Sequence, residues 1–292
     1  MDTLAQLLVN GLGKGAVFAL LALGFVVIFK ATEVVNFAHG SLVLFGGYLV
    51  VVTRDALGWV GAAAVGIAGA GLLALIVERL LLARSKLADP FSLALLTIGV
   101  DVVVTEEIVR RLGVSVPFLG EAWDAQPIQV GGITLFRTHL VALVVATVLI
   151  TAFFVAFRHS NWGIAMRAQA ENREAAALAG IRSSRVTATA WLVAGLLAGV
   201  AVLFIATQDF SGSGLSRGTH SIALAAFPAA ILGGLDSTAG AVVGGITVGL
   251  VDALTTHYIS FSFAKSAVFL VMLVVLVVRP SGLFGTREVT RV

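Results

Sequence analysis

The sequence predicts an all-α fold, a polytopic transmembrane bundle of about 8–10 helices that forms one domain over residues 1–292. Hydrophobic residues make up 59% of the chain and charged residues only 12%, whereas a soluble domain carries about 25% charged residues. The apolar residues are gathered in long stretches, as a hydrocarbon core of roughly 30 Å requires. The chain also holds 32 glycines, which let membrane helices pack closely.

Apolar stretches recur along the whole chain and define the expected helices. Those at 36–52, 219–235 and 239–256 are short and rich in glycine, which is typical of helices that transporters break around a central pathway. We expect helices at 7–29, 36–52, 60–82, 93–109, 139–157, 186–207, 219–235, 239–256 and 263–279.

The first apolar stretch is expected to be retained as a membrane span. It follows Asp2, lacks a basic segment before it, and is longer than the apolar part of a signal peptide.

The distribution of Lys and Arg predicts the orientation. With the N-terminus outside, twelve of the 19 basic residues fall in inner loops and six in outer loops, and Lys14 lies within the first span. Cytoplasmic loops carry the excess of basic residues, so we expect the N-terminus outside and the C-terminus in the cytoplasm.

Two long polar loops complete this topology. Residues 110–138 are expected outside and residues 158–185 inside. The inner loop is rich in helix formers over residues 163–179, and Gly180 is placed as a C-terminal stop. We therefore expect one short amphipathic helix, or a pair of them, on the inner face.

Polar residues inside apolar stretches are the candidates for a transport pathway. Asn36 and His39 lie three apart, on one helical face; they either line the pathway or start a helix, with Asn36 as its N-cap. An unpaired Asp101 would cost several kcal/mol in a bilayer, so it should face a cavity or a partner or be protonated, and Thr97 and Thr105 share its face. The pathway candidates are Asn36, His39, Ser41, Thr97, Asp101 and His220.

Other charged and small residues in these stretches have simpler expected roles. Lys14 and Asp252 are expected to extend their charged ends toward the membrane interface. Five glycines should serve close helix packing: Gly233, Gly234, Gly244, Gly245 and Gly249.

Several chemistries are excluded. The chain has no cysteine and no pair of histidines spaced to bind zinc with a nearby Glu. The segment GLGKG at residues 11–15 lacks the spacing of a phosphate-binding loop. We therefore expect a non-catalytic chain without cofactor, metal or nucleic-acid partner, its basic residues serving topology.

Four segments, in this order, carry a resemblance to a known family. They are residues 11–49 with the core Asn36-Phe37-Ala38-His39-Gly40, AENREAAALAGI at 170–181, AFPAAILGGLDSTAGAVVGGITVGLVDAL at 226–254, and RPSGLFG at 279–285. Together they resemble the branched-chain amino acid permease family of ABC importers, in particular its Liv-type H subunits. The chain departs from that family at Asp101 and at residues 236–240, where Gly-Ser-Ile-Pro-Gly is common.

The resemblance implies a permease subunit in the inner or plasma membrane of a prokaryotic cell. Its partners would be a homologous permease, two cytoplasmic ATP-binding subunits that hydrolyse ATP, and an extracytoplasmic solute-binding protein, within membrane lipid. The solute would be a branched-chain amino acid or a similar small polar molecule, such as urea or a short amide.

The resemblance also assigns the inner loop, residues 158–185, to contact with the ATPase. Its charged residues would meet a partner surface and its small apolar residues would dock in a groove; the alternative is a helix resting on lipid. The coupling candidates are Glu171, Arg173, Glu174, Ala175, Ala176, Leu178 and Gly180.

Two alternatives remain open at this level. The chain could be a channel or secondary transporter that works alone, for which paired intramembrane charges are the expected sign. The segments starting at Asn36 and Thr219 share a polar start, a His and a Gly-Gly end; this is either an inverted repeat or a coincidence.

Overall fold

The fold is helical, as predicted. The computed structural model describes residues 2–85, 89–114, 116–120, 122–123, 126–130, 133–211 and 214–286. In this part of the chain six helices are long and apolar enough to cross a membrane. They are α1 (Asp2–Thr32), α2 (His39–Ile76), α4 (Arg137–His159), α7 (Ser183–Ile205), α11 (Thr238–Tyr258) and α12 (Phe261–Val278).

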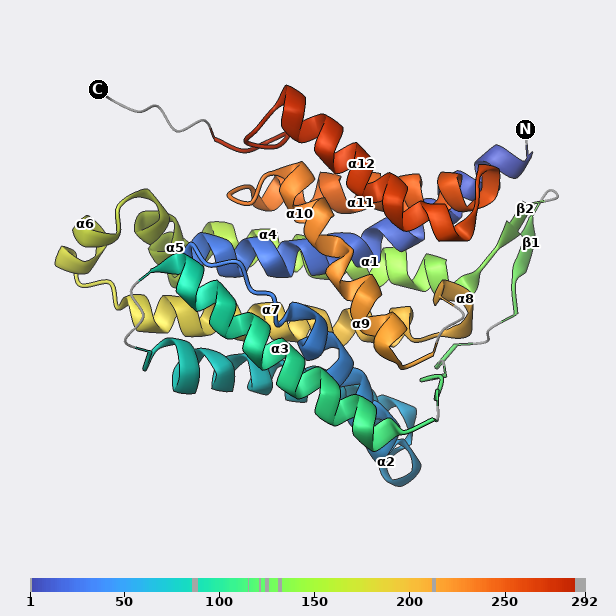
Figure 1. Ribbon diagram of the computed structural model, residues 1–292, viewed down its shortest axis with the longest axis horizontal. Coiled ribbons are helices and arrows are strands. Elements are labelled where there is room, and N and C mark those ends of the chain that lie inside the picture. The colour runs from blue at the N-terminus through green and yellow to red at the C-terminus, as the bar shows by residue number, and fades with distance from the viewer. Residues whose placement is uncertain are drawn as a thin grey trace.

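Helix α1 occupies the centre of the bundle (Figure 1). Its stretch from Val17 to Ile28 is apolar on all sides, which is the pattern of a helix enclosed by others, and these residues are almost fully buried. Helices α11, α7, α4 and α10 pack around it. Gly245 and Gly249 of α11 lie against the backbone of Ala19 and Gly15, where no side chain would fit. This confirms the packing role predicted for those two glycines.

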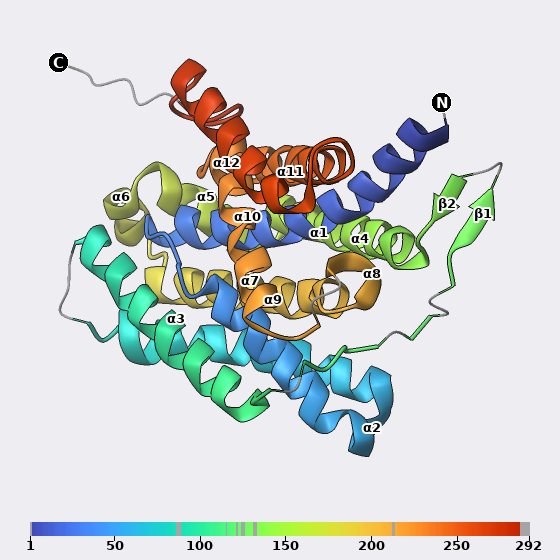
Figure 2. The ribbon, with the colours of Figure 1, turned by 45° about the vertical axis from the view of Figure 1, so that its right-hand side comes forward.

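Helix α2 contains two of the predicted segments, 36–52 and 60–82. Gly58 has a φ of +68° inside the helical stretch, a left-handed conformation that favours glycine, and the chain reverses there (Figures 1 and 2). Gly46 on the first leg lies against the Gly66 carbonyl on the second. A π-helical turn, η1 (Val77–Leu82), extends the second leg.

The predicted breaks in short segments are partly right. Residues 219–235 form two helices, α9 (Arg217–Leu224) and α10 (Ala226–Gly233), which meet at Ala225. The prediction is wrong for 239–256, because α11 is continuous over 21 residues. The segment at Asn36 enters a helix that is unbroken from His39 up to the reversal at Gly58, whereas the segment at Thr219 is broken at Ala225. The two similar sequences therefore fold differently.

Helix α3 (Pro90–Leu112) has the length of a span but carries Asp101, Glu106 and Glu107. It packs against α2 and α9 on one side. Its other side exposes large apolar residues such as Phe91, at 71% exposure, and Val103, at 70%.

The two long loops lie at opposite ends of the molecule (Figure 1). The 158–185 loop holds α5 (Asn161–Glu171) and α6 (Arg173–Leu178), so of the two predicted arrangements the pair of helices is present. The 110–138 loop holds a hairpin that the sequence did not predict, with β1 (Ile128–Val130) antiparallel to β2 (Ile133–Leu135). The short helix α8 (Gln208–Ser211) lies at the hairpin's end of the molecule.

Candidate functional site

The connection between α1 and α2 is a short non-helical segment, residues 33–38, held by side chains. The Thr97 hydroxyl accepts a hydrogen bond from the Phe37 backbone N–H at 3.0 Å. The Asn36 side-chain oxygen accepts one from the Ala38 N–H at 3.0 Å. Ala38 is the N-cap of α2, so the alternative that Asn36 caps the helix is wrong; Asn36 instead shapes the turn before it.

Asp101 caps α2 from a different helix. Ala38 offers no side-chain acceptor, and the first N–H groups of a helix need one. The Asp101 carboxylate accepts a hydrogen bond from the Ser41 N–H at 3.1 Å. The positive end of the helix dipole favours this negative charge.

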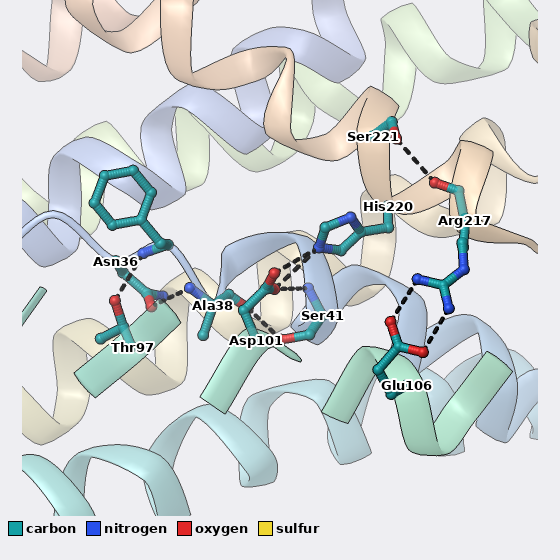
Figure 3. A network of polar contacts seen from close by, with 10 residues as sticks. Asn36, Ala38, Ser41, Thr97, Asp101, Glu106, Arg217, His220 and Ser221 are labelled. Atoms are coloured by element: carbon teal, nitrogen blue, oxygen red, sulfur yellow. Dashed lines mark hydrogen bonds and ion pairs between the residues drawn. The ribbon is translucent and has the colours of Figure 1, made fainter. Parts of the chain in front are cut away.

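The same carboxylate also holds α9. His220 Nε2 lies 2.9 Å from one Asp101 oxygen and 3.0 Å from the other. The two side chains are only 14% and 15% exposed. Asp101 therefore joins α2, α3 and α9 at one point (Figure 3), and the expectation that it needs a partner is confirmed.

A second ion pair ties α9 to α3. The Arg217 guanidinium donates to both carboxylate oxygens of Glu106, in the bidentate arrangement that gives the strongest such pairs. Neither residue was among the candidates. Arg217 and His220 are three apart on one face of α9, and this spacing was the available signal in the sequence for a shared partner helix.

Two histidines pack against glycines at the Asn36–Gly40 motif. A side chain on Gly40 would lie 2.7 Å from the His220 ring, so only glycine lets α9 approach the start of α2. His39 points the other way, against Gly24 and 4.4 Å from the Phe25 ring centre. It is fully buried, and no described residue hydrogen-bonds its ring nitrogens.

The structure thus brings five of the six pathway candidates into one network: Asn36, Ser41, Thr97, Asp101 and His220. His39 lies beside it, buried against α1. The network is nearly closed to solvent, since Asn36, Ser41 and Thr97 are fully buried. In this conformation its direct role is to hold α2, α3 and α9 together.

Lys14 and Asp252 form an ion pair, which the sequence analysis did not anticipate. Lys14 Nζ lies 3.0 Å from Asp252 Oδ2, with exposures of 18% and 21%. Glycines at the α1–α11 contact bring the two helices close enough for this pair, and a paired charge is far less costly inside a membrane.

At the opposite end, α5 is anchored to the bundle by buried polar contacts. The Gln169 amide nitrogen donates to the Ala31 carbonyl of α1 at 2.8 Å. The Trp162 indole N–H donates to the Val186 carbonyl of α7 at 3.3 Å. Arg167 donates to the Phe157 carbonyl at the end of α4. A displacement of α5 would therefore act on α1, α4 and α7 together.

Helix α6 projects at the tip of this end (Figure 1). Asn172 caps it by accepting a hydrogen bond from the Ala175 N–H. Gly180 ends it with a φ of +84°, and its N–H donates to the Ala177 carbonyl, which confirms the predicted stop.

The coupling candidates on α5 and α6 do not share one face. Leu178 is 91% exposed, whereas Ala176 is only 5% exposed and points into the chain. Glu171, Arg173, Glu174, Ala175 and Gly180 are exposed. Leu178 is thus the large apolar side chain that α6 exposes.

The C-terminal RPSGLFG motif binds the turn between α10 and α11. The Leu283 and Phe284 N–H groups donate to the Leu232 and Gly233 carbonyls at 2.9 and 3.0 Å. Gly234 has a φ of +106° there and its Cα lies against Gly285. An open cavity of about 700 Å³ lies beside this turn, with Lys30, Arg167 and Thr286 on its walls.

A buried acidic residue was missed by the sequence analysis. Glu78 lies in η1, is 4% exposed, and accepts a hydrogen bond from the Thr187 hydroxyl at 3.0 Å. It lines a cavity of about 260 Å³ that Arg173 of α6 also lines. An acidic residue within an apolar stretch was the available signal. Among the described residues no cluster of three or more potential metal ligands occurs.

Comparisons with known proteins agree with this architecture. The chain is 28% identical over 302 residues to the high-affinity branched-chain amino acid transport system permease protein LivH of Escherichia coli K12, covering 98% of this chain and 97% of that protein. It is 25% identical over 310 residues to BraD of Pseudomonas aeruginosa, a permease protein of the same description, with the same coverage.

A solved structure shares the fold. The PsaBC structure from Streptococcus pneumoniae in complex with Fab matches with a TM-score of 0.53 and 14% identity, over 95% of this chain and 91% of that one. At this identity the likeness concerns the fold alone. The family model described as branched-chain amino acid transport system / permease component matches residues 7–278. The chain therefore belongs to the permease component family of branched-chain amino acid transport systems.

Proposed function

We propose that this chain is the permease subunit of an ATP-driven importer for branched-chain amino acids or a similar small polar solute. The observation that carries the proposal is the arrangement of the α5–α6 pair. One helix is bonded to the ends of α1, α4 and α7, and the other projects with an exposed Leu178. Such a pair can pass a partner's motion into the bundle.

The partners of this permease follow from the same proposal. A homologous permease would complete the pathway, two ATP-binding subunits would bind the end that carries α6, and a solute-binding protein would deliver solute at the hairpin end. Large apolar residues exposed on α3 and α12 support contact with lipid and with the second permease. ATP hydrolysis belongs to the partner subunits.

The orientation in the proposal places α6 in the cytoplasm. The basic residues of the 158–185 loop support this side, and the hairpin then faces outward. Solute entering near the hairpin would pass the broken helix α9–α10 toward the end that carries α5 and α6.

During transport the Asp101 network, which joins Asn36 before α2, Ser41 on α2 and Thr97 on α3, would be part of the moving machinery, together with the neighbouring His39. His220 and Arg217 hold α9 against α3. Release of α9 would open a path between α9 and α3, and the buried polar groups at the start of α2 would then meet solute.

Leu178→Glu tests the coupling role. We expect the ATPase to detach, because a charge would replace the exposed apolar contact, while the permease remains folded. Ile164→Glu, at an exposed position on the neighbouring α5, is the matched control and should keep the ATPase bound. Ala176→Trp is unsuitable, since Ala176 is buried within the chain itself.

Co-purification of the ATPase and solute-stimulated ATP hydrolysis are the measurements. If Leu178→Glu retains both at wild-type levels, α6 rests on lipid or on solvent and the coupling role is wrong. Solute uptake by the chain in the absence of any ATPase would instead support a transporter that works alone.

A further inference from the structure

A small cavity lies between the outer ends of α1, α9, α11 and α12. Its volume is about 110 Å³. That exceeds the roughly 10–15 Å³ that one water needs, and it is well below the about 300 Å³ at which pockets for drug-sized ligands begin. The cavity therefore suits a small solute.

Charges of both signs line one part of this cavity. Lys14 and Asp252 form the ion pair described above, and Lys265 of α12 also lines the cavity. Within the described residues no ion pair is found for Lys265. A ligand with a single charge would be attracted to one of these groups and repelled by another, whereas a ligand with both charges complements the set.

The remaining walls are apolar. Aromatic rings and an aliphatic side chain line the space, with Phe261 at its exposed side (63% exposed). Gly218 and Ala225 leave room by their small size. The apolar lining residues are Phe18, Phe210, Ile222 and Phe261.

The cavity borders the broken helix. One face of α9 lines it through residues at i, i+4 and i+7, namely Gly218, Ile222 and Ala225 at the end of the helix. The other face of α9 holds α3 through Arg217 and His220. Interrupted helices are where transporters place solute sites. Occupancy of the cavity can thus act on the same helix that the Asp101 network restrains.

We propose that this cavity is a binding site for a zwitterionic amino acid with an apolar side chain. Asp252 receives the ligand ammonium, Lys14 and Lys265 receive its carboxylate, and the aromatic walls receive its side chain. An ammonium is required because a carboxylate that takes Lys14 would otherwise leave Asp252 without a counter-charge, which is costly in a buried site. The inference rests on the proposed function and names the site of that solute within this chain.

The test is direct binding of radiolabelled L-leucine to the permease in nanodiscs, assembled with its permease and ATPase partners but without the solute-binding protein. We expect saturable binding. We also expect competition at least tenfold weaker from 4-methylpentanoate, which lacks the ammonium, and from 3-methylbutylamine, which lacks the carboxylate.

Two variants test whether Lys14 and Asp252 form the leucine site. In Asp252→Asn, 4-methylpentanoate should compete as well as leucine. The double variant Lys14→Met/Asp252→Leu removes both charges together, a change that buried pairs tolerate; it should keep its thermal stability and lose leucine binding. Unchanged leucine binding in this double variant, or no saturable binding to the wild type, overturns the proposal.

A zwitterionic lipid headgroup presents the same charges. Nanodiscs of phosphatidylglycerol alone and nanodiscs with added phosphatidylethanolamine separate the two sources. Retention of phosphatidylethanolamine through Lys14 and Asp252, with no leucine binding in either disc, overturns the proposal in favour of a lipid. ATP-driven leucine uptake that the double variant preserves refutes this site but leaves the proposed function intact; absence of any such uptake refutes the proposed function.

Discussion

Asp101 bonds to two other helices through one carboxylate, so a substitution at this position tests both contacts. Asp101→Ala removes the acceptor for the Ser41 N–H and the partner of His220. A buried group left without its hydrogen-bond partner costs about 1–3 kcal/mol. We expect Asp101→Ala to lower the unfolding temperature and Asp101→Asn, which keeps an acceptor oxygen, to lower it less.

Thermal unfolding in detergent measures this order. Glu107→Gln is the control on the same helix, since Glu107 pairs only with the exposed Arg110 and Arg111 among the contacts described for it, and exposed pairs contribute little. Equal unfolding temperatures for Asp101→Ala and Glu107→Gln would contradict the capping role of Asp101.

Glycines on buried and open helix surfaces should respond in opposite ways to alanine. Gly249→Ala would force a methyl group into the backbone of Gly15, so we expect loss of stability. Gly99→Ala is the control, because nothing lies within 4 Å of that position and alanine favours a helix by about 1 kcal/mol. Unfolding by denaturant should show Gly249→Ala below the wild type and Gly99→Ala at or above it.

At the scale of elements, the bond between α5 and α1 should be needed for coupling and not for docking. Gln169→Leu removes the hydrogen bond to the Ala31 carbonyl, yet leaves α6 and Leu178 in place. We expect the ATPase to co-purify normally while solute uptake per ATP hydrolysed falls several-fold.

Ile164→Ala, at an exposed position on α5, serves as the control and should keep normal uptake. Uptake per ATP that is unchanged in Gln169→Leu would mean that α5 does not transmit motion to α1. Loss of ATPase binding in that variant would mean instead that the Gln169 bond positions the docking tip.

At the scale of the whole molecule, the two ends of the bundle should face different compartments. The chain has no cysteine, so Gln129→Cys in β1 and Ser184→Cys at the start of α7 provide single labelling sites, both exposed. We expect an impermeant thiol reagent to label Gln129→Cys in intact cells and to reach Ser184→Cys only after permeabilisation. The reverse pattern would invert the orientation.

Composition and hydropathy alone determined the helical, membrane-spanning class of this protein, its apolar segments and the presence of helix in the 158–185 loop. These features are local, because a bilayer selects length and hydropathy of each segment and caps such as Asn172 and Gly180 act within one turn. The Asn36–Gly40 motif and the isolated Asp101 also marked the region in which the structure places the polar network, since polar groups in a membrane must find partners.

Tertiary structure decided which partners these groups have. The sequence does not reveal that Asp101 caps α2 and meets His220, residues 60 and 119 positions away, or that Lys14 pairs with Asp252 across α1 and α11. The sequence also predicted that Ala176 and Leu178 share one exposed surface, whereas in the folded chain Ala176 is buried and Leu178 is exposed. Such contacts depend on how helices distant in the chain approach, and that approach is set by where opposed glycines allow backbones to touch.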